Sequence, residues 1–294
     1  MQILICGATG LIGSALTELC IQQNHTIHYL TTRKSKIEQS DQKKGFYWNP
    51  AEGEIDKACF EGVDVIINLS GASIAKRWTQ AYKEEIMSSR VNTANILFKS
   101  LRNMENHTIK HYVSASGTAI YPCSLTEYYK EDTEKEATDF LGDVVKQWEL
   151  HASQFKSLEI PVTILRTGLV FSKNGGALVE MVKPVKYGVG AAIGSGKQWQ
   201  SWIHIDDIAN MYLHVITENC TGVYNGVGPN PTTNKLLTKE IATVLKKPFF
   251  LPNVPKFMMK LILGEMSTLL FSSQQVSAEK IEATGFKFKY SELN

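Results

Sequence analysis

Three glycines near the N-terminus have the spacing of a dinucleotide-binding turn. The stretch Gly7-Ala8-Thr9-Gly10-Leu11-Ile12-Gly13 follows a short apolar run at residues 2–6 and opens an amphipathic stretch at residues 11–23. The first glycine would permit a tight turn, the second would let the backbone approach a pyrophosphate, and the third would let a helix pack closely on a strand. Helix N–H groups and the positive end of the helix dipole would then face the phosphates. The pattern predicts a dinucleotide site at a strand-to-helix junction.

Arg33 indicates which dinucleotide this turn accepts. A second apolar run, residues 26–31, ends next to Thr32 and Arg33, where an NAD-selective site usually carries an Asp or Glu for the ribose 2′-OH. A guanidinium is a permanently charged, multidentate donor that suits a 2′-phosphate, and the Thr32 hydroxyl could donate to the same group. These residues favour NADP(H) over NAD(H). The alternative is that Arg33 is one charge of a solvated basic loop that continues through Lys34, Lys36, Lys43 and Lys44.

A third apolar run repeats the pattern of a strand followed by a glycine. Residues 64–69 lead directly into Ser70-Gly71-Ala72. Close backbone contacts from Leu69, Ser70 and Gly71 would line the adenosine side of the dinucleotide. The same residues also fit an ordinary strand-to-loop turn.

Alternating short apolar runs and longer amphipathic ones are typical of a parallel sheet with crossover helices. The predicted strands are residues 2–6, 26–31, 63–69, 111–114 and 162–166, and the predicted helices are residues 11–23, 79–101 and 140–155. After Gly168 the chain becomes glycine-rich over residues 172–201, a strand runs into a helix over residues 202–215, and a proline-bearing helical stretch begins at Pro229. The predicted fold class is α/β, a Rossmann-type doubly wound parallel sheet with a small, mainly helical C-terminal lobe. Residues 1–170 and about 202–228 would form the NADP-binding domain, and residues 171–201 and 229–294 would cover the substrate.

Composition excludes several classes of partner. The chain has 294 residues, of which 43% are hydrophobic and 20% charged, and its formal net charge of +2 is too close to neutral to predict nucleic acid or an anionic membrane as a partner. No apolar run approaches the roughly 20 residues of a membrane span, and no basic leader precedes the first apolar run. The five cysteines are widely spaced and contain no CxxC pair, which favours reduced thiols over a zinc site or disulfides. We expect a cytoplasmic protein without a metal.

Motifs spread along the whole chain resemble those of one protein family. They include Ser89-Arg90-Val91, Arg166-Thr167-Gly168, Gly194–Gln198, Trp202-Ile203-His204-Ile205-Asp206-Asp207, Leu263-Gly264-Glu265-Met266 and Gly285-Phe286-Lys287-Phe288. Together with the glycine turn, they resemble the extended short-chain dehydrogenases/reductases. More narrowly, they resemble the atypical epimerase family subgroup, whose C-terminal region is a small domain of unknown function.

This resemblance implies a set of cofactor contacts. The dinucleotide would be held by Gly7, Thr9, Gly10, Leu11 and Ile12, its 2′-phosphate by Thr32 and Arg33, and its adenine half by Asn68, Leu69 and Ser70. Glu85 and Arg90 would both approach the cofactor, although a spacing of five does not make them close neighbours on a helix. Ser114 would lie at the end of the fourth strand, and Arg166, Thr167 and Gly168 would face the nicotinamide half.

The resemblance also shows what catalytic machinery is missing. The wider family uses a tyrosine and, four residues later, a lysine that lowers the tyrosine pKa. When Glu149 serves as the anchor, these two positions fall on Leu141 and Val145, which transfer no proton, and Lys146 is one residue away. Ser89 likewise stands where the wider family commonly has an asparagine. Ser116, Tyr121 and Lys146 remain as candidate catalytic groups, with Ser116 bonding a substrate oxygen.

Three further residues are candidates for the substrate pocket. Arg77, between Lys76 and Trp78, would bind an anionic group at the pocket mouth, although a surface turn fits equally well. Trp199 and Trp202 would supply large rigid pocket walls.

Two polar groupings favour structural roles instead. His204 with Asp206 and Asp207 fits a strand end followed by a helix that Asp206 caps, rather than a metal site. Tyr128 and Tyr129 fit a surface lid in a polar loop rather than catalysis.

The leading functional hypothesis is an NADP(H)-binding oxidoreductase or epimerase-like protein that acts on a small carbonyl or hydroxyl compound, such as a sugar nucleotide. The rival is a non-catalytic NADP(H)-binding protein that senses redox state or regulates a partner. A homodimer could form through the helices at residues 79–101 and 140–155, although helices that pack on the core would carry the same pattern.

Overall fold

The computed structural model describes residues 1–293, and its centre is one eight-stranded sheet of order β12-β8-β6-β5-β1-β2-β3-β4. All neighbouring strands pair in parallel except β4, which is antiparallel to β3. The sheet strands are β1 (Gln2–Cys6), β2 (Thr26–Thr31), β3 (Lys43–Asn49), β4 (Glu54–Ile55), β5 (Val65–Asn68), β6 (His111–Gly117), β8 (Val162–Thr167) and β12 (Gly222–Gly226). The predicted doubly wound parallel sheet is therefore confirmed.

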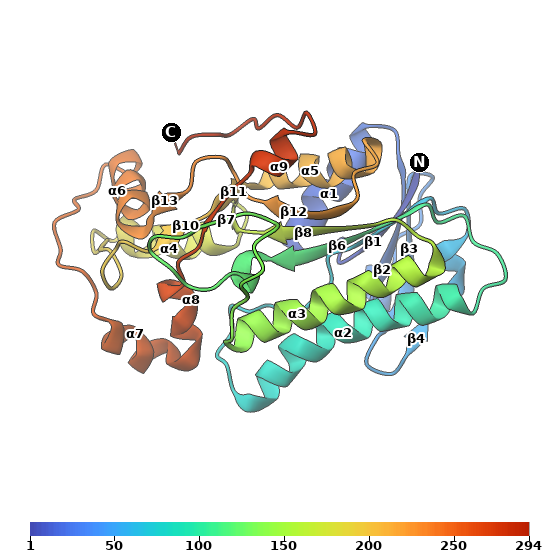
Figure 1. Cartoon of the computed structure of the whole chain (residues 1–294), viewed down its shortest axis with the longest axis horizontal. Coiled ribbons are helices and arrows are strands. Elements are labelled where there is room, and N and C mark those ends of the chain that lie inside the picture. Colours follow the sequence, from blue (N-terminus) through green and yellow to red (C-terminus); the bar gives the residue numbers. More distant parts are fainter. Residues whose placement is uncertain (294) are drawn as a thin grey trace.

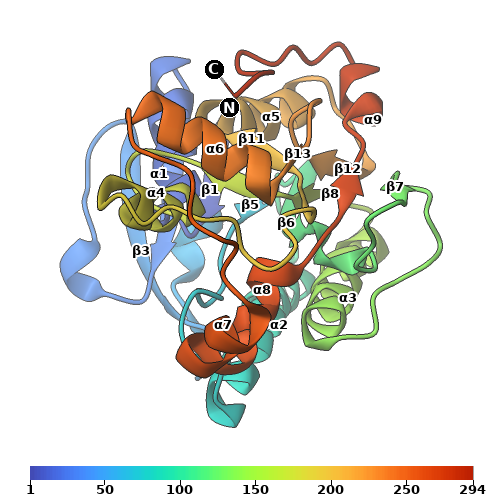
Figure 2. The same cartoon turned by 90° about the vertical axis from the view of Figure 1, so that its left-hand side faces the viewer.

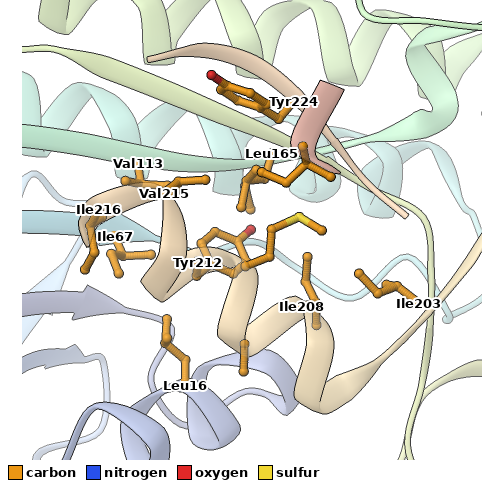
Figure 3. Close-up of a cluster of buried hydrophobic side chains, with 14 of the residues drawn as sticks. Leu16, Ile67, Val113, Leu165, Ile203, Ile208, Tyr212, Val215, Ile216 and Tyr224 are labelled. Atoms are coloured by element: carbon orange, nitrogen blue, oxygen red, sulfur yellow. The ribbon is translucent and has the colours of Figure 1, made fainter. Parts of the chain in front are cut away.

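Helices cover both faces of the sheet (Figure 1). α1 (Leu11–Gln22) and α5 (Ile205–Thr217) lie on one face, and α2 (Gln80–Arg102) and α3 (Phe140–Ser153) lie on the other. Alternate residues of β1 point to opposite faces, so Ile3 and Ile5 pack with α1 and α5, whereas Leu4 and Cys6 pack with α2 and α3. Figure 3 shows the first of these clusters, in which side chains of α5 interdigitate with those of the strands. Burial on both faces explains the nearly continuous apolar runs of these strands.

Most of the remaining elements lie in the segments predicted to form the C-terminal lobe. The remaining helices are α4 (Ala177–Lys186), α6 (Asn234–Val244), α7 (Lys256–Leu263), α8 (Thr268–Phe271) and α9 (Glu279–Glu282), and Ile281 of α9 packs in the core cluster with α1 and α5. The short strands outside the sheet are β7 (Tyr128–Tyr129), β9 (Leu169–Phe171), β10 (Trp199–Gln200), β11 (Trp202–His204), β13 (Thr232–Thr233) and β14 (Gln275–Val276). Single turns of 3₁₀ helix occur at Lys34–Lys36, Lys57–Phe60, Thr118–Ile120, Gln154–Leu158 and Gly264–Ser267. The predicted domain limits, residues 1–170 with 202–228 and residues 171–201 with 229–294, stay a prediction.

Three local predictions were wrong. Lys43 and Lys44 begin β3 instead of lying in a solvated loop. Tyr129 is buried and stacks on Tyr121, because β7 pairs with β14 and is thereby drawn onto the body of the protein. The cap of α5 is His204, whose ring nitrogen accepts a hydrogen bond from the backbone N–H of Asp206, so Asp206 lies in the first turn of the helix.

Within residues 1–293, no helix is both long enough and apolar enough to cross a bilayer.

Candidate functional site

The glycine turn connects β1 to α1 beside β5, where the strand order of the sheet reverses. Gly7 has φ +85°, and a Cβ there would lie 3.0 Å from the backbone carbon of Leu69. A Cβ on Gly13 would lie 2.1 Å from the carbonyl oxygen of Gly7, so only glycine lets α1 approach this closely. Gly10 caps α1 without a side-chain hydrogen bond, and Thr9 and Gly10 are exposed. The first turn of α1 therefore offers uncapped N–H groups at the position where α/β sheets bind ligands.

Arg33 lies at the end of β2, the strand next to this turn. Thr32 and Arg33 are exposed, and the Arg33 backbone N–H donates to the hydroxyl oxygen of Thr31 at 3.2 Å. Within residues 1–293 the guanidinium has no hydrogen-bond or ion-pair partner. It is free to meet an anion.

The backbone of the loop after β5 is fixed by hydrogen bonds to the side chains of Asn68 and Ser89. Asn68 is fully buried, and its amide oxygen accepts a hydrogen bond from the Ser70 backbone N–H at 3.1 Å. The Ser89 hydroxyl accepts one from the backbone N–H of Ala72 at 2.9 Å. Leu69 and Ser70 are half-buried beside the first glycine. These contacts fix a backbone turn alongside the glycine turn.

Arg90 lies under this loop and is the most unusual charge in the molecule. Arg90 is only 9% exposed. One of its guanidinium nitrogens donates to the carbonyl oxygens of Ala72 and Ile86, and the guanidinium lies 4.8 Å from the centre of the Trp148 ring. No carboxylate of residues 1–293 pairs with it, and its Nε has no partner. Burial lowers the pKa of Arg90 to about 10. Glu85 does not supply the missing charge, because it is exposed and makes no ion pair with Arg90.

A buried polar network joins the carboxyl ends of β6, β8 and β12. The Ser116 hydroxyl donates to Glu149 at 2.6 Å, and the Arg166 guanidinium donates to both oxygens of Glu149 at 2.9 Å. Arg166 also donates to the Tyr121 hydroxyl at 2.9 Å, and that hydroxyl donates to the amide oxygen of Asn225 at 2.8 Å. Two predicted catalytic residues, Ser116 and Tyr121, are therefore brought together with Arg166.

The surroundings shift the pKa of two groups in this network. Burial opposes the charge of Arg166, but hydrogen bonding and attraction to Glu149 outweigh it and raise the pKa of Arg166. Burial likewise raises the pKa of Tyr121, although Arg166 works against this. The Tyr121 phenol is therefore neutral near neutral pH and does not act as a phenolate base.

Sequence reasoning used Glu149 only as an anchor and missed its contacts, as it missed Asn225. The signal was present in Arg166, which follows Val162-Thr163-Ile164-Leu165 in a buried strand. A guanidinium in such a strand favours a carboxylate partner, because charged side chains are seldom buried unless they are paired.

The structure does not bring Lys146 into the network. Its ammonium lies 3.5 Å from Glu136 and 3.8 Å from Asp143. Val145, at the position anchored for the family lysine, is buried, and a Cβ added to Gly117 would touch its side chain at 3.6 Å.

The remaining predicted residues occupy varied surroundings. Trp202 is 3% exposed, stacks on Phe171 and donates its indole N–H to the carbonyl oxygen of Asn230. Trp199 is half-buried and donates to the carbonyl oxygen of Leu125. Arg77 is exposed beside Gly264 of the lobe.

The other five residues fall near the sheet or the glycine turn. Leu11 and Ile12 are half-buried in the first turn of α1, with Leu11 against Gly175 and Gly176. Ser114 is fully buried, and Thr167 and Gly168 follow Arg166 at the end of β8.

The fold and the glycine turn define a Rossmann-type nucleotide-binding protein of the extended class. Residues 3–227 match the model of the NAD dependent epimerase/dehydratase family, and residues 254–294 match a domain of unknown function, DUF1731. The chain belongs to the NAD dependent epimerase/dehydratase family, which confirms the resemblance.

Relatives along the full length carry the same description. Epimerase family proteins of Staphylococcus aureus strain MRSA252 and Staphylococcus saprophyticus are 40% and 39% identical to it over 293 and 292 residues, which are 99% of this chain and 96% of each relative. Human epimerase family protein SDR39U1 (isoform 2), crystallised with NADPH, is 30% identical with a TM-score of 0.85, and the match covers 100% of this chain and 96% of the human one. A UDP-glucuronic acid 4-epimerase from Bacillus cereus, in complex with UDP-glucuronic acid and NAD, shares the fold at a TM-score of 0.77 and 16% identity, over 99% of this chain and 95% of that one.

Proposed function

We propose that this chain binds NADP(H) along the carboxyl ends of β1, β2 and β5 and acts on a small carbonyl or hydroxyl compound as an oxidoreductase or epimerase. The observation that carries the proposal is the unpaired Arg33 guanidinium at the end of the strand next to the glycine turn. A 2′-phosphate would supply its counter-charge. NADPH in the crystal structure of the human relative supports the same choice.

The residues present fit the nucleotide. Gly7 leaves no room for a side chain against the Leu69–Ser70 turn, and Gly13 leaves none within the glycine turn itself. The uncapped start of α1 suits a pyrophosphate. Thr9, Leu11 and Ile12 would flank the phosphates, and the Asn68–Ser70 turn would flank the adenosine. Arg90 would contribute its uncompensated charge from beneath the Ser70–Ala72 loop.

Bound NADP(H) would supply the hydride, and the chain would supply a fixed polar surface beside it. Ser116 directs its proton toward Glu149, so its oxygen is orientated to accept a hydrogen bond from a substrate hydroxyl. Arg166 holds Glu149 through two hydrogen bonds and thereby fixes the position of the serine. Arg77 and Trp199 would border the substrate from the lobe side.

A second candidate function, NADP(H) binding without catalysis, is favoured by two observations. The Tyr121 hydroxyl already has both a donor and an acceptor inside the protein. Lys146 is engaged by carboxylates away from the Ser116 network. Neither group is therefore poised for proton transfer in the usual family manner.

Calorimetric titration with NADPH and NADH tests the cofactor. Wild type should bind NADPH more tightly, and Arg33→Ala should weaken NADPH binding by about 10- to 150-fold, equivalent to the roughly 1.5–3 kcal/mol of hydrogen bonds to a charged group, while leaving NADH unchanged. Lys36→Ala is the matched control, because Lys36 is another exposed cation after β2. Equal binding of both nucleotides by wild type would remove the basis for the NADP(H) assignment.

Deuterium transfer separates the two functions. Protein would be incubated with NADPH deuterated at C4 and a panel of aldehydes, ketones and sugar nucleotides, and products would be examined by mass spectrometry. Deuterium in a product, diminished by Ser116→Ala while NADPH binding persists, supports the enzyme. Tight NADPH binding with no transfer to any compound, and with no epimerisation of the sugar nucleotides when NADP+ is supplied instead, favours the non-catalytic candidate.

A further inference from the structure

Large apolar side chains are exposed at one end of the C-terminal lobe. Tyr187 is 85% exposed at the end of α4, Phe250 is 75% exposed after α6, and Phe257, Leu261 and Ile262 of α7 are 72%, 83% and 65% exposed. Figures 1 and 2 show α4, α6 and α7 at this same end of the molecule, on the left in the first view and facing the viewer in the second. Exposed apolar side chains scattered singly need no explanation, but a cluster marks an interaction surface.

The segments that carry these side chains are tied together. The backbone N–H of Gly194, in the loop after α4, donates to the carbonyl oxygen of Val254, just before α7. The Asn253 amide donates back to the carbonyl oxygen of Gly194 at 2.9 Å. The loop after α4 and the segment just before α7 therefore lie side by side. We call this part of the molecule the lobe tip and define it as residues 187–196 and 246–263.

Helix α7 presents its apolar side chains outward. Phe257 and Leu261 are one turn apart, as are Met258 and Ile262, so the four form a stripe along the helix. None of the eight residues of α7 is fully buried. A stripe of this kind normally faces a core, but here it is open to the surroundings.

The lobe tip and its surroundings are strongly basic. Residues 172–201 and 229–263 contain ten lysines and only two acidic residues, Glu180 and Glu240. The whole chain has 31 Lys and Arg against 29 Asp and Glu, so the remaining residues carry an acidic excess. Lys246 and Lys247 are exposed before Phe250, and Lys256 and Lys260 are exposed on α7 itself. A net charge close to neutral thus hides a pronounced asymmetry.

We propose that the lobe tip docks on an anionic lipid surface. Apolar side chains of α7 and Phe250 would enter the interface between headgroups and acyl chains, while the surrounding lysines would meet lipid phosphates. The combination of protruding aromatic and aliphatic side chains with lysines is the pattern of interfacial helices rather than of a spanning segment. This proposal departs from the expectation, drawn from the overall charge, that no membrane is a partner.

Other occupants fit the charge less well. A second copy of the chain would bring two lysine-rich tips together, and like charges facing each other oppose association. Nucleic acid would use the lysines but not the protruding phenylalanine and leucine side chains. An acidic protein is the remaining alternative, and it would be favoured if the protein failed to bind anionic vesicles.

Vesicle co-sedimentation of the full-length protein tests the proposal. The probes are phosphatidylcholine vesicles that contain phosphatidylglycerol, and vesicles of phosphatidylcholine alone. The protein should sediment with the anionic vesicles, less so as salt is raised. The double variant Phe257→Ala/Leu261→Ala should bind at least about tenfold more weakly, and each of Lys256→Gln and Lys260→Gln should weaken binding about fivefold, equivalent to about 1 kcal/mol.

A matched control keeps the result specific. Leu150→Ala removes an apolar side chain that is 59% exposed on α3 and should bind like wild type. Thermal unfolding of each variant confirms that it is folded. The substituted α7 residues are exposed, so their replacement removes no buried core contact. Three results would each overturn the proposal. The first is that the protein fails to bind anionic vesicles at low salt, in which case an acidic protein becomes the candidate partner. The second is that the Phe257→Ala/Leu261→Ala variant binds the vesicles as tightly as wild type does. The third is that wild type self-associates in the absence of vesicles and that this variant does not.

Discussion

Three arginines near the carboxyl edge of the sheet meet three different electrostatic environments. Arg166 is paired with Glu149, Arg33 is exposed, and Arg90 is buried without a carboxylate. Removing a guanidinium from water without a counter-charge costs free energy, which folding alone does not return. An anionic ligand would supply the missing counter-charge. The Arg90 guanidinium would therefore favour ligand binding while its burial lowers the stability of the ligand-free protein.

Arg90→Met should separate these two quantities. The substitution retains an unbranched chain against Trp148 and removes the buried charge, so ligand-free stability should change by less than about 1.5 kcal/mol, as for a volume-conserving exchange. NADPH binding should weaken by about tenfold or more, since one charge-assisted contact is lost. Thermal unfolding with and without NADPH measures both. A large loss of ligand-free stability with a normal NADPH shift would mean that Arg90 only supports the Ala72 loop.

Two residues of α3 offer a sharp contrast at the same scale. Glu149 and Arg166 have side chains only 14% and 10% exposed, so Glu149→Ala should cost about 3–5 kcal/mol by leaving Arg166 buried and unpaired. Lys146 lies at 3.5 Å and 3.8 Å from carboxylates that are more than half exposed, so Lys146→Ala should cost less than about 1 kcal/mol. Urea unfolding compares them. Similar losses for the two variants would show that the Glu149–Arg166 pair is not a dominant contact of this edge.

At the scale of elements, local sequence patterns predicted the parts of the fold that local forces decide. The predicted strand at residues 26–31 coincides with β2, and the helix predicted at residues 79–101 begins beside Thr79, whose side chain caps Tyr82. Strand β3 was missed because Lys43, Lys44 and Gly45 obscure its pattern, and its place depends on pairing with β2. Pairings between distant segments, such as β7 with β14, leave no comparable local trace.

The candidate site shows the same division. Glycine spacing predicted the turn after β1, and the sequence placed Arg33 at the end of β2, because both features depend on neighbours within a few residues. The binding of a 2′-phosphate by Arg33 stays a prediction. The polar network depends on contacts between residues such as Ser116 and Glu149, which are 33 positions apart, and Tyr121 and Asn225, which are 104 apart. Geometry of that kind becomes visible only when the strands are assembled. The sequence offered one indication of this network, the charged residue Arg166 at the end of an apolar strand.

His111 makes the stability of β6 sensitive to pH. Its ring is 3% exposed and lies 2.7 Å from the Thr163 hydroxyl oxygen of the neighbouring strand, and burial lowers its pKa. The unfolded chain therefore takes up a proton near the ordinary histidine pKa of about 6.5, at which the folded protein does not. Stability is complete above that pH and falls as the pH decreases below it, by up to about 1.4 kcal/mol per unit until the lowered folded pKa is reached.

The comparison of wild type with His111→Gln at several pH values measures this term. The variant should be less stable than wild type near neutral pH, and the gap should narrow as the solution is acidified toward about pH 5, since glutamine does not titrate. Chemical unfolding at each pH gives the two curves. Parallel curves would show that folding does not change the pKa of His111, and would contradict the effect of burial.

At the scale of the whole molecule, the C-terminal segment returns to the sheet from the lobe and holds the two together. α8 leads into Ser273 and Gln274, whose side chains donate to the carbonyl oxygens of Ser124 and Tyr121, and β14 then pairs with β7. Figure 1 shows this segment passing from α8 to α9, after which the chain runs back toward the end of the molecule where α6 lies. The same segment begins at α7. A short stretch of chain therefore connects the lobe tip to Gln274, which contacts the backbone of Tyr121 in the polar network.

The end of this segment is anchored by one buried carboxylate, Asp207. It is 1% exposed in α5, and its two oxygens accept the backbone N–H groups of Lys289 and Tyr290 at 2.8 Å and 2.9 Å. Asp207→Asn replaces one acceptor with a donor that faces an N–H group, so it should cost about 1–3 kcal/mol and release the last residues from α5. Hydrogen exchange should then accelerate at Lys289 and Tyr290 while the amides of β1 and β5 stay protected. Asp206→Asn is the control, because Asp206 is 44% exposed and makes only contacts of 3.4–3.7 Å to side chains. Equal release by both variants would show that the tail is held by the Tyr290 ring on His204 rather than by the Asp207 carboxylate.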